Sequence, residues 1–379
     1  MADSPSVFEG GGVLSYHHKL IESTYAPCDV TFLLKPVEIA PTSVVEKEAL
    51  IQSGRAHYSE MISLERRPDA HYMDMFEAAR SAGEGRIARE ILSLAEMIRL
   101  RVSEGEIESP VTLCSLVRAG VPYGVLLLRA LRHLGVEVAH FGISIIRDRG
   151  LDANAIAWIL RDRPAGGVIF VDGWTGKGAI SNELSASWSA ISGGRRAELA
   201  VLADPSGFAT MSGSHEDWLI PSGLLGANVS GLISRSILNR DVVGPRDFHA
   251  AIPTPHLKDI DVSMAFVDSI WSKACALDPS RIALPVAADR SLLRKSALDA
   301  VNAIAAVHGV DNLNRIKPGI AEATRAVLRR KPKQVFLRDI EDPDLSPLVH
   351  LCRTDGIGIC VDSAKTGPYR AVTLIEKVG

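Results

Sequence analysis

Between residues 110 and 204 the sequence alternates short apolar runs with longer segments of helical pattern. The runs are almost free of charged residues, which is typical of strands that are buried on both faces of a parallel sheet. They cover residues 110–117, 136–146, 166–172 and 197–204, and residues 217–222 are a candidate fifth strand. Strands that alternate with helices join into one sheet through crossover connections, with helices on both faces. The sequence therefore predicts an α/β fold.

The composition changes after Ala276, where a second unit of alternating helices and strands begins. A chain of 379 residues is long enough for two or three domains. We predict a flexible, Gly- and Ser-rich N-terminus at 1–25, a large α/β domain at 26–275, and a small α/β domain at 281–379. Both domains are within the usual size range.

The charge and the cysteines exclude several classes of protein. The formal net charge is −3, so no global positive field indicates nucleic-acid binding. The five cysteines are scattered without CxxC spacing, which argues against a disulfide framework and a structural zinc site. Arg129, Arg132 and His133 interrupt the most apolar segment, so it does not fit a membrane span. We expect a cytoplasmic protein that contacts no membrane, and its oligomeric state stays open.

The third apolar run ends in a glycine-rich turn, "VDGWTGKGAI", that opens a helix. Ligands bind α/β sheets at the carboxyl ends of strands, and closely spaced glycines bring backbone N–H groups to a phosphate. A Walker A loop needs other glycine spacing and a Ser or Thr where Gly178 stands. A dinucleotide-binding turn follows the first strand and spaces its glycines differently. The remaining alternative is a strand-to-helix turn without a ligand.

This turn resembles the PRPP-binding motif of type I phosphoribosyltransferases. The resemblance implies that Asp172 binds the ribose hydroxyls and takes part in catalysis. It also implies that the loop holds the 5′-phosphate through Thr175, Gly176, Lys177, Gly178 and Ala179. The motif usually begins with two adjacent acids, but Val171 replaces the first. Thr175 stands where purine-salvage members have a further carboxylate.

Two other stretches resemble parts of the same enzymes and occur in the matching order. "SLVRAGVPYG" resembles the pyrophosphate-binding turn, which implies pyrophosphate contacts from Arg118, Ala119 and Gly120. "ISIIRDRGLD" lies where these enzymes have a mobile catalytic loop, so Arg147 and Arg149 would close over the leaving group. An anionic leaving group needs clustered positive charge and Mg²⁺. PRPP would carry the Mg²⁺, with no direct protein ligand.

More specifically, residues 26–275 resemble the StiP family, phosphoribosyltransferase-like proteins associated with bacterial tellurium-resistance and stress operons. "DVTFLL", "EKEALIQSGRAHYSEM" and "LIPSGLLGANVSGLISRSI" carry this resemblance together with the stretches above. The implied fold is a type I phosphoribosyltransferase-like sheet with an N-terminal hood that includes His57 and Tyr58. The polar segment after the fourth strand supplies candidates for acceptor contacts, namely Asp204, Ser206, Gly207 and His215.

The C-terminal unit carries the strongest local positive charge. Residues 312–338 contain eight Lys or Arg and one Glu, a footprint of phosphate binding whose alternative is a solvated basic face. The stretch resembles the Pelota-type RNA-binding domain, related to ribosomal proteins that bind kink-turn RNA. Ala321 replaces an Asn that often reads a base there, which argues against sequence-specific binding. The RNA-binding residues implied by the resemblance are Lys317, Gly319, Glu322, Arg325, Arg329 and Lys331.

Together, these resemblances predict a PRPP-dependent phosphoribosyltransferase that acts on a nucleobase-like acceptor, releases pyrophosphate and also binds RNA. The alternative is a non-catalytic, PRPP-sensing RNA-binding regulator, which the missing carboxylates favour. A cysteine hydrolase ranks last, because it needs a thiol activated by an imidazole. None of the five cysteines lies in a recognisable nucleophile turn.

Overall fold

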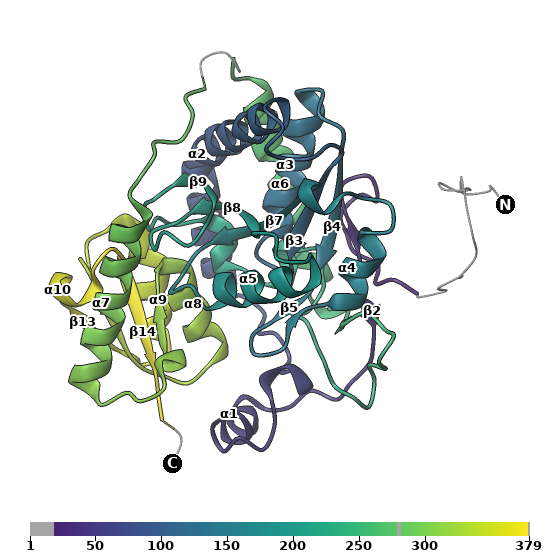
Figure 1. Cartoon of the computed structure of the whole chain (residues 1–379). Coiled ribbons are helices and arrows are strands. Elements are labelled where there is room, and N and C mark those ends of the chain that lie inside the picture. The colour runs from purple at the N-terminus through teal and green to yellow at the C-terminus, as the bar shows by residue number, and fades with distance from the viewer. Residues whose placement is uncertain (1–18, 279–281, 378–379) are drawn as a thin grey trace.

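The computed structural model describes residues 19–278 and 282–377 and shows two α/β units in contact (Figure 1). The larger unit is built on a parallel six-stranded sheet with the order β1-β4-β3-β7-β8-β9. Its strands are β1 (Thr31–Phe32), β3 (Val111–Leu116), β4 (Val138–Ile143), β7 (Val168–Trp174), β8 (Glu198–Ala203) and β9 (Met211–Ser214). The predicted α/β fold with a parallel sheet is confirmed.

Helices cover both faces of this sheet (Figure 1). One layer consists of α2 (Ala70–Ser103), α3 (Val121–His133) and α6 (Ser263–Cys275), and the other of α4 (Ala153–Ile159) and α5 (Ala179–Ile191). The Asp69 carboxylate accepts the Tyr72 N–H at 2.8 Å and so caps the first turn of α2. Strand β3 is buried along its whole length, as expected of a central strand between two helical layers. No helix among the described residues has the length and apolarity needed to cross a bilayer.

Short elements surround the carboxyl ends of the strands. Strand β2 (Lys35–Pro36) pairs with β10 (Ala250–Ala251), and β5 (Ile145–Ile146) forms a hairpin with β6 (Gly150–Leu151). Helix α1 (Val44–Gln52) stands apart from the sheet, near the smaller unit (Figure 1). The 3₁₀ turns of this unit are η1 (Tyr58–Glu60), η2 (Ala165–Gly167), η3 (Pro221–Leu224), η4 (Ala227–Val229) and η5 (Pro255–Ile260).

The smaller unit has a mixed four-stranded sheet with the order β11-β14-β12-β13. Its strands are β11 (Ile316–Pro318), β12 (Pro332–Leu337), β13 (Gly358–Val361) and β14 (Ala371–Ile375). Its helices are α7 (Arg290–His308), α8 (Ile320–Arg329), α9 (Ser346–Thr354) and α10 (Ser363–Thr366), with 3₁₀ turns η7 (Leu313–Arg315) and η8 (Pro343–Leu345). The prediction of a small C-terminal α/β unit is confirmed.

Polar contacts hold the smaller unit against the larger one from two sides. The buried Asp217 carboxylate accepts the backbone N–H groups of Ile320 at 3.0 Å and of Arg370 at 2.7 Å. On the other side, the Arg330 guanidinium donates to the Glu48 carboxylate of α1 at 2.8 Å. The start of α8 is therefore fixed beside the carboxyl ends of the large sheet.

One predicted strand is wrong. Residues 217–222 do not join the sheet but lead into η3, and the sixth strand of the sheet is β9 at 211–214. The reason is the position of Asp217, whose carboxylate binds amides of the smaller unit instead of facing solvent. The chain turns away from the sheet at this point.

The N-terminal segment 1–25 is described only from residue 19 onward. Residues 1–18 lie outside the described part of the chain. In the remainder, Ile21 and Tyr25 are buried, and the Tyr25 hydroxyl donates to the Val229 carbonyl at 2.8 Å. The domain boundaries stay a prediction.

Candidate functional site

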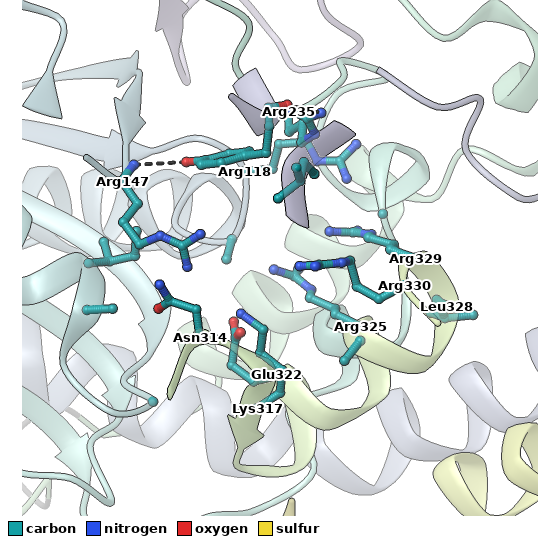
Figure 2. Close-up of a pocket in the computed structure, with 18 of the residues that line it drawn as sticks. Arg118, Arg147, Arg235, Asn314, Lys317, Glu322, Arg325, Leu328, Arg329 and Arg330 are labelled. Atoms are coloured by element: carbon teal, nitrogen blue, oxygen red, sulfur yellow. Dashed lines mark hydrogen bonds between the residues drawn. The ribbon is translucent and has the colours of Figure 1, made fainter. Parts of the chain in front are cut away.

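A cavity of about 1250 Å³ lies between the two units, beside the carboxyl ends of β3 and β7 (Figure 2). We call it the shared cavity, because both units line it. Its cationic lining residues are Lys47, Arg55, Arg66, Arg118, Arg147, Arg149, Lys177, Arg235, Arg315, Lys317, Arg325, Arg329, Arg330 and Lys377. Two sets of residues that were predicted separately, for a sugar phosphate and for RNA, therefore face one space.

Asp172 lies near the end of β7 and lines the shared cavity. One of its carboxylate oxygens accepts the Gly173 N–H at 2.8 Å. Burial raises the pKa of Asp172 to about 7, with a further increase from Glu322, while the Gly173 N–H and Arg325 act in the opposite direction. A carboxyl group with this pKa can hold or release a proton near neutral pH.

The glycine-rich turn after β7 is fixed from beneath by buried side chains. Gly178 has a φ of 83°, and a Cβ there would collide with the Phe208 ring, so this position requires glycine. The Thr175 hydroxyl donates to the Asp204 carboxylate, and the Ser206 hydroxyl donates to Thr175 Oγ1 at 2.7 Å. All five residues predicted to hold the 5′-phosphate line the shared cavity, namely Thr175, Gly176, Lys177, Gly178 and Ala179.

The smaller unit covers part of this turn. The Lys177 ammonium donates to the carbonyl of Ile316 at 2.8 Å and also to that of Leu313. Burial lowers the pKa of Lys177 to about 7, and the neighbouring cations Lys317 and Arg147 lower it further. The lysine that was predicted to bind a phosphate is thus bound to backbone carbonyls of the C-terminal unit.

The turn after β3 carries the predicted pyrophosphate contacts. Arg118 and Ala119 line the shared cavity, and a side chain at Gly120 would overlap the Val171 carbonyl of the neighbouring strand. The Arg118 side chain is only 5% exposed, and its Nη1 lies 2.6 Å from the Glu65 carboxylate. This guanidinium therefore has an internal partner.

Arg147 and Arg149 lie on the β5–β6 hairpin and both line the shared cavity. The Arg147 backbone N–H donates to the Tyr58 hydroxyl at 2.8 Å, and its guanidinium lies 5.4 Å from the centroid of the Tyr58 ring. Figure 2 shows this guanidinium pointing across the cavity toward α8. Arg149 lies 3.7 Å from Glu60 and is 45% exposed.

The four predicted acceptor contacts lie behind the glycine-rich turn. Asp204 and Ser206 are fully buried, and the Asp204 carboxylate accepts two backbone N–H groups at 2.9 and 3.0 Å. The Gly207 carbonyl accepts from Arg294 of α7 at 2.8 Å, and His215 Nδ1 lies 3.4 Å from the Asp204 carbonyl. None of the four occurs among the described residues that line the shared cavity. They hold the turn and α7 in place.

Helix α8 and strand β11 form the C-terminal wall of the shared cavity (Figure 2). Of the predicted RNA-binding residues, this wall contains Lys317, Glu322, Arg325 and Arg329. Gly319 lies instead against Asp217, and Lys331 pairs with Glu376 at 2.6 Å at the protein surface. Only part of the predicted basic stretch therefore lines the shared cavity.

Arg325 crosses from the smaller unit to the larger one. Its guanidinium lies 4.5 Å from the centroid of the Trp174 ring at the end of β7. Its Nε has no hydrogen-bond partner, and burial lowers its pKa. Burial also lowers the pKa of Lys317 to about 8 and that of Arg329 to about 9.

Sequence reasoning missed Lys47, Glu65, Trp174 and Arg235. Burial lowers the pKa of Lys47 to about 8, and the positive charge of Arg235 lowers it further. Trp174 carried a usable signal, because an aromatic residue inside a phosphate-type turn can stack against a base or an arginine. Lys47 and Arg235 lie within stretches that carry the StiP resemblance, but nothing in those stretches assigned them a role, and Glu65 lies outside every quoted stretch.

The cysteines differ in accessibility. Cys114 and Cys352 are buried, and burial raises the pKa of both thiols, that of Cys352 to about 12. Cys28 and Cys275 are exposed, and Cys360 is partly buried. Within the part of the chain that the structure describes, no cysteine lines the shared cavity.

The sequence resemblance implied Mg²⁺ that PRPP would carry, with no direct protein ligand. In residues 19–278 and 282–377, no cluster of three or more His, Cys, Asp or Glu side chains could hold a metal ion. The Mg²⁺ expected from the sequence stays a prediction.

Known proteins resemble both units. The family model described as "Tellurite-like stress resistance cysteine protease StiP" matches residues 23–271, and that of the PELOTA RNA binding domain matches residues 295–377. A relative from Acinetobacter baylyi, named "Cysteine protease StiP", is 43% identical over 366 residues, which is 94% of each chain.

Solved structures resemble this chain only weakly. The hypoxanthine phosphoribosyltransferase of Trypanosoma cruzi is 16% identical with a TM-score of 0.30, over 45% of this chain and 94% of that chain. The HGPRT-ase from Leishmania tarentolae is 14% identical with a TM-score of 0.26, over 33% of this chain and 70% of that chain. Similarity at this level carries no argument about function.

These findings overturn the predicted function. The family description and the relative's name both give a cysteine protease, which ranked last from the sequence. The prediction of a phosphoribosyltransferase with PRPP and a nucleobase as partners is wrong, and the PRPP-sensing alternative falls with it. Lys177 and Arg118, which the prediction assigned to phosphate groups, have internal partners in this structure: Lys177 donates to a backbone carbonyl and Arg118 pairs with Glu65. The coarser expectation of an enzyme agrees with both names.

Two family models that match different parts of the chain assign the two units to protein families. The first family model covers most of the larger unit, the second covers the smaller one, and the relative spans nearly the whole chain. The resemblance that the sequence indicated is confirmed. The chain belongs to the StiP family and carries a C-terminal Pelota RNA-binding domain.

Proposed function

We propose that this protein binds single-stranded RNA in the shared cavity, with RNA phosphates contacting cations of both domains. The observation that carries the proposal is the convergence of Lys317, Arg325 and Arg329 of the Pelota domain with Arg147 and Arg235 of the StiP domain. RNA affinity depends strongly on such clustered positive charge. The Pelota family match supports RNA as the anion.

The pKa values of the lining residues support this proposal. Burial is the largest cause of the lowered pKa of Lys47, Lys317 and Arg329, and neighbouring arginines lower each pKa further. Such mutual repulsion means that the cavity holds more positive charge than its own carboxylates compensate. A bound phosphate would supply the missing negative charge and raise these pKa values.

Flat side chains beside the cations favour unpaired bases. The Arg325 guanidinium lies over Trp174, and those of Arg147 and Arg235 lie 5.4 and 5.5 Å from the Tyr58 ring centroid. Aromatic rings and guanidinium planes are the surfaces on which proteins stack splayed-out bases. The volume of about 1250 Å³ exceeds the usual 300–1,000 Å³ of small-molecule sites, so we propose that more than one nucleotide enters.

The test measures the affinity of the full chain for a labelled 12-nucleotide single-stranded RNA by fluorescence anisotropy. We expect the double variant Arg325→Glu/Arg329→Glu to bind about 100-fold more weakly, because each charged contact contributes on the order of 1.5 kcal/mol. Lys331→Glu is the matched control, since it reverses a charge on the same domain but outside the cavity. It should bind within about twofold of the wild type.

The outcomes separate the ligand classes. Equal losses in the double variant and the control would place binding on the outer surface and refute the proposal. Tighter binding of a kink-turn duplex than of the single strand would also refute it, because the proposal requires unpaired bases in the cavity. Competition by mononucleotides as strong as by RNA would identify a small phosphorylated ligand instead. The slope of the logarithm of affinity against the logarithm of salt concentration gives the number of phosphate contacts.

A second candidate function is thiol-dependent peptide hydrolysis, which the family description and the relative's name favour. A nucleophilic cysteine must be accessible and able to form a thiolate. Exposure points to Cys28, Cys275 and Cys360, because Cys114 and Cys352 are buried with raised pKa values.

The test of this candidate combines alkylation with three single variants. Cleavage of an unfolded protein substrate should be abolished by iodoacetamide and by one of Cys28→Ser, Cys275→Ser or Cys360→Ser, while the other two stay active. Cys114→Ser serves as the buried control, checked for folding by its thermal midpoint. Activity that survives alkylation and all three substitutions would refute a mechanism based on these thiols.

A further inference from the structure

Glu65 lies on an irregular segment, residues 61–69, that connects η1 to α2 along the wall of the shared cavity. The segment has no helix or strand of its own, and Leu64 next to Glu65 is 67% exposed. The Glu65 side chain nevertheless reaches deep into the cationic lining. The groups around its carboxylate are hydrogen-bond donors and cations, as in an anion-binding site.

The Glu65 carboxylate receives donors from three separate elements. Arg118 approaches it with two nitrogens, at 2.6 and 3.2 Å. The Ala227 N–H at the start of η4 donates to Oε1 at 3.2 Å, and Arg329 of the Pelota domain lies 3.5 Å from the same oxygen. Two guanidinium groups and a backbone amide are the donor set that proteins use for phosphate and carboxylate ligands.

The neighbouring backbone approaches this carboxylate closely. A side chain at Gly226 would overlap the Glu65 carboxylate, so the backbone approaches the anion as closely as glycine permits. Burial alone would raise the pKa of Glu65, but Arg118 and Arg329 outweigh it and lower the pKa to about 2. The carboxylate is therefore charged at every physiological pH.

The anchors of segment 61–69 are weaker than the site itself. Arg66 pairs with Asp355 at 3.2 Å, and Arg67 pairs with Asp259, and both arginine side chains are about half exposed. Solvent-exposed ion pairs contribute little to stability. These two ion pairs therefore add little to the cost of moving the segment.

We propose that Arg118, Arg329 and the Ala227 N–H form an anion subsite, and that a phosphate of the bound RNA exchanges with the Glu65 carboxylate there. Glu65 thus competes with the ligand for the same donors. This inference rests on the proposed RNA-binding function for the identity of the ligand. The existence of the subsite can be tested without RNA.

The test uses inorganic phosphate as the probe and the full chain with Glu65→Gln. Removing the internal charge should tighten phosphate binding at least tenfold over the wild type in isothermal titration. Glu48→Gln is the matched control, because Glu48 pairs with the adjacent Arg330 at 2.8 Å but is not among the cavity-lining residues. An equal gain in both variants would mean a general electrostatic effect and would overturn the subsite.

A second variant keeps the charge and changes only the reach. Glu65→Asp shortens the side chain by one methylene, so it should weaken the internal contact and give a gain of about threefold. No gain in either Glu65 variant would show that the Arg118–Glu65 pair is purely structural. Thermal melts check that each variant is folded, and a variant that does not fold leaves the other to decide.

RNA measurements distinguish failure of this inference from failure of the proposed function. If the wild type binds RNA but neither Glu65 variant gains affinity for phosphate or RNA, the subsite is refuted and the RNA-binding function stands. If Glu65→Gln gains phosphate affinity while no variant binds RNA, the subsite stands and RNA is the wrong ligand.

Discussion

The shared cavity has two walls, the StiP wall from lining residues 44–235 and the Pelota wall from lining residues 311–377. They carry similar charges but compensate them differently. On the StiP wall, Arg118 is bound by Glu65 at 2.6 Å, and Arg235 donates to the Tyr58 carbonyl at 2.7 Å. On the Pelota wall, the Nε of Arg325 has no partner, and Lys317 has a pKa lowered to about 8 by burial. The comparison shows that counting cations does not locate a binding site. What matters is which cations still need an anion.

The largest effect is expected from separating the two walls. Asp217→Ala removes the acceptor of the Ile320 and Arg370 amides and should destabilise the docked arrangement by about 3 kcal/mol, because two buried donors lose their partner. Urea denaturation should then show two transitions instead of one. Glu216→Ala is the control, since the adjacent Glu216 side chain is 62% exposed. A single, unshifted transition in Asp217→Ala would contradict this role.

A smaller effect is expected within the StiP wall, where two glycines of one turn differ. Gly178→Ala should cost about 2 kcal/mol, because φ is 83° and the new Cβ meets the Phe208 ring. Gly176→Ala should cost well under about 1 kcal/mol, since the nearest atoms to its Cβ are 3.6 Å away. Thermal midpoints of both variants check this. Equal decreases of the thermal midpoint in the two variants would mean that the turn is less rigid than its contacts indicate.

The smallest effect concerns pH and one lysine on each wall. Lys47 and Lys317 have pKa values lowered to about 8, so they are charged below pH 8 and lose their charge as the pH rises through this value. RNA affinity should fall by about tenfold between pH 7 and pH 9.5, at fixed ionic strength.

Lys317→Arg sharpens this test, because arginine keeps its charge over the whole range. Between pH 7 and pH 9.5, the RNA affinity of the variant should fall less than that of the wild type. An affinity that does not change between pH 7 and pH 9.5 would show that these lysines do not contact the ligand.

Much of the fold was predictable because its elements have regular periods. The runs at 110–117 and 166–172 are apolar and end at turns, so β3 and β7 were placed within two residues of their observed bounds. Strand β9 was missed, since "MSGS" has neither β-branched residues nor an apolar run. The assignment of 217–222 failed for the opposite reason, because its apolar residues pack between the two domains rather than in the sheet.

The site was only partly predictable. Arg118, Arg147, Asp172 and Arg325 were found from local patterns, and all four line the shared cavity. That they share one cavity depends on how the domains dock, which involves residues more than 100 positions apart, such as Asp217 and Ile320. Glu65 is the clearest example of what a motif cannot show, because its importance comes only from the donors that surround it.

The two walls of the shared cavity are synthesised at different times. The StiP wall is encoded mostly before residue 236, whereas Lys317, Arg325 and Arg329 are among the last 63 residues of the chain. A growing chain can complete its large sheet long before these cations leave the ribosome. The shared cavity therefore forms only after the Pelota domain has been synthesised, and a chain that stops before this domain would keep Arg118 and Glu65 but lack the opposite wall.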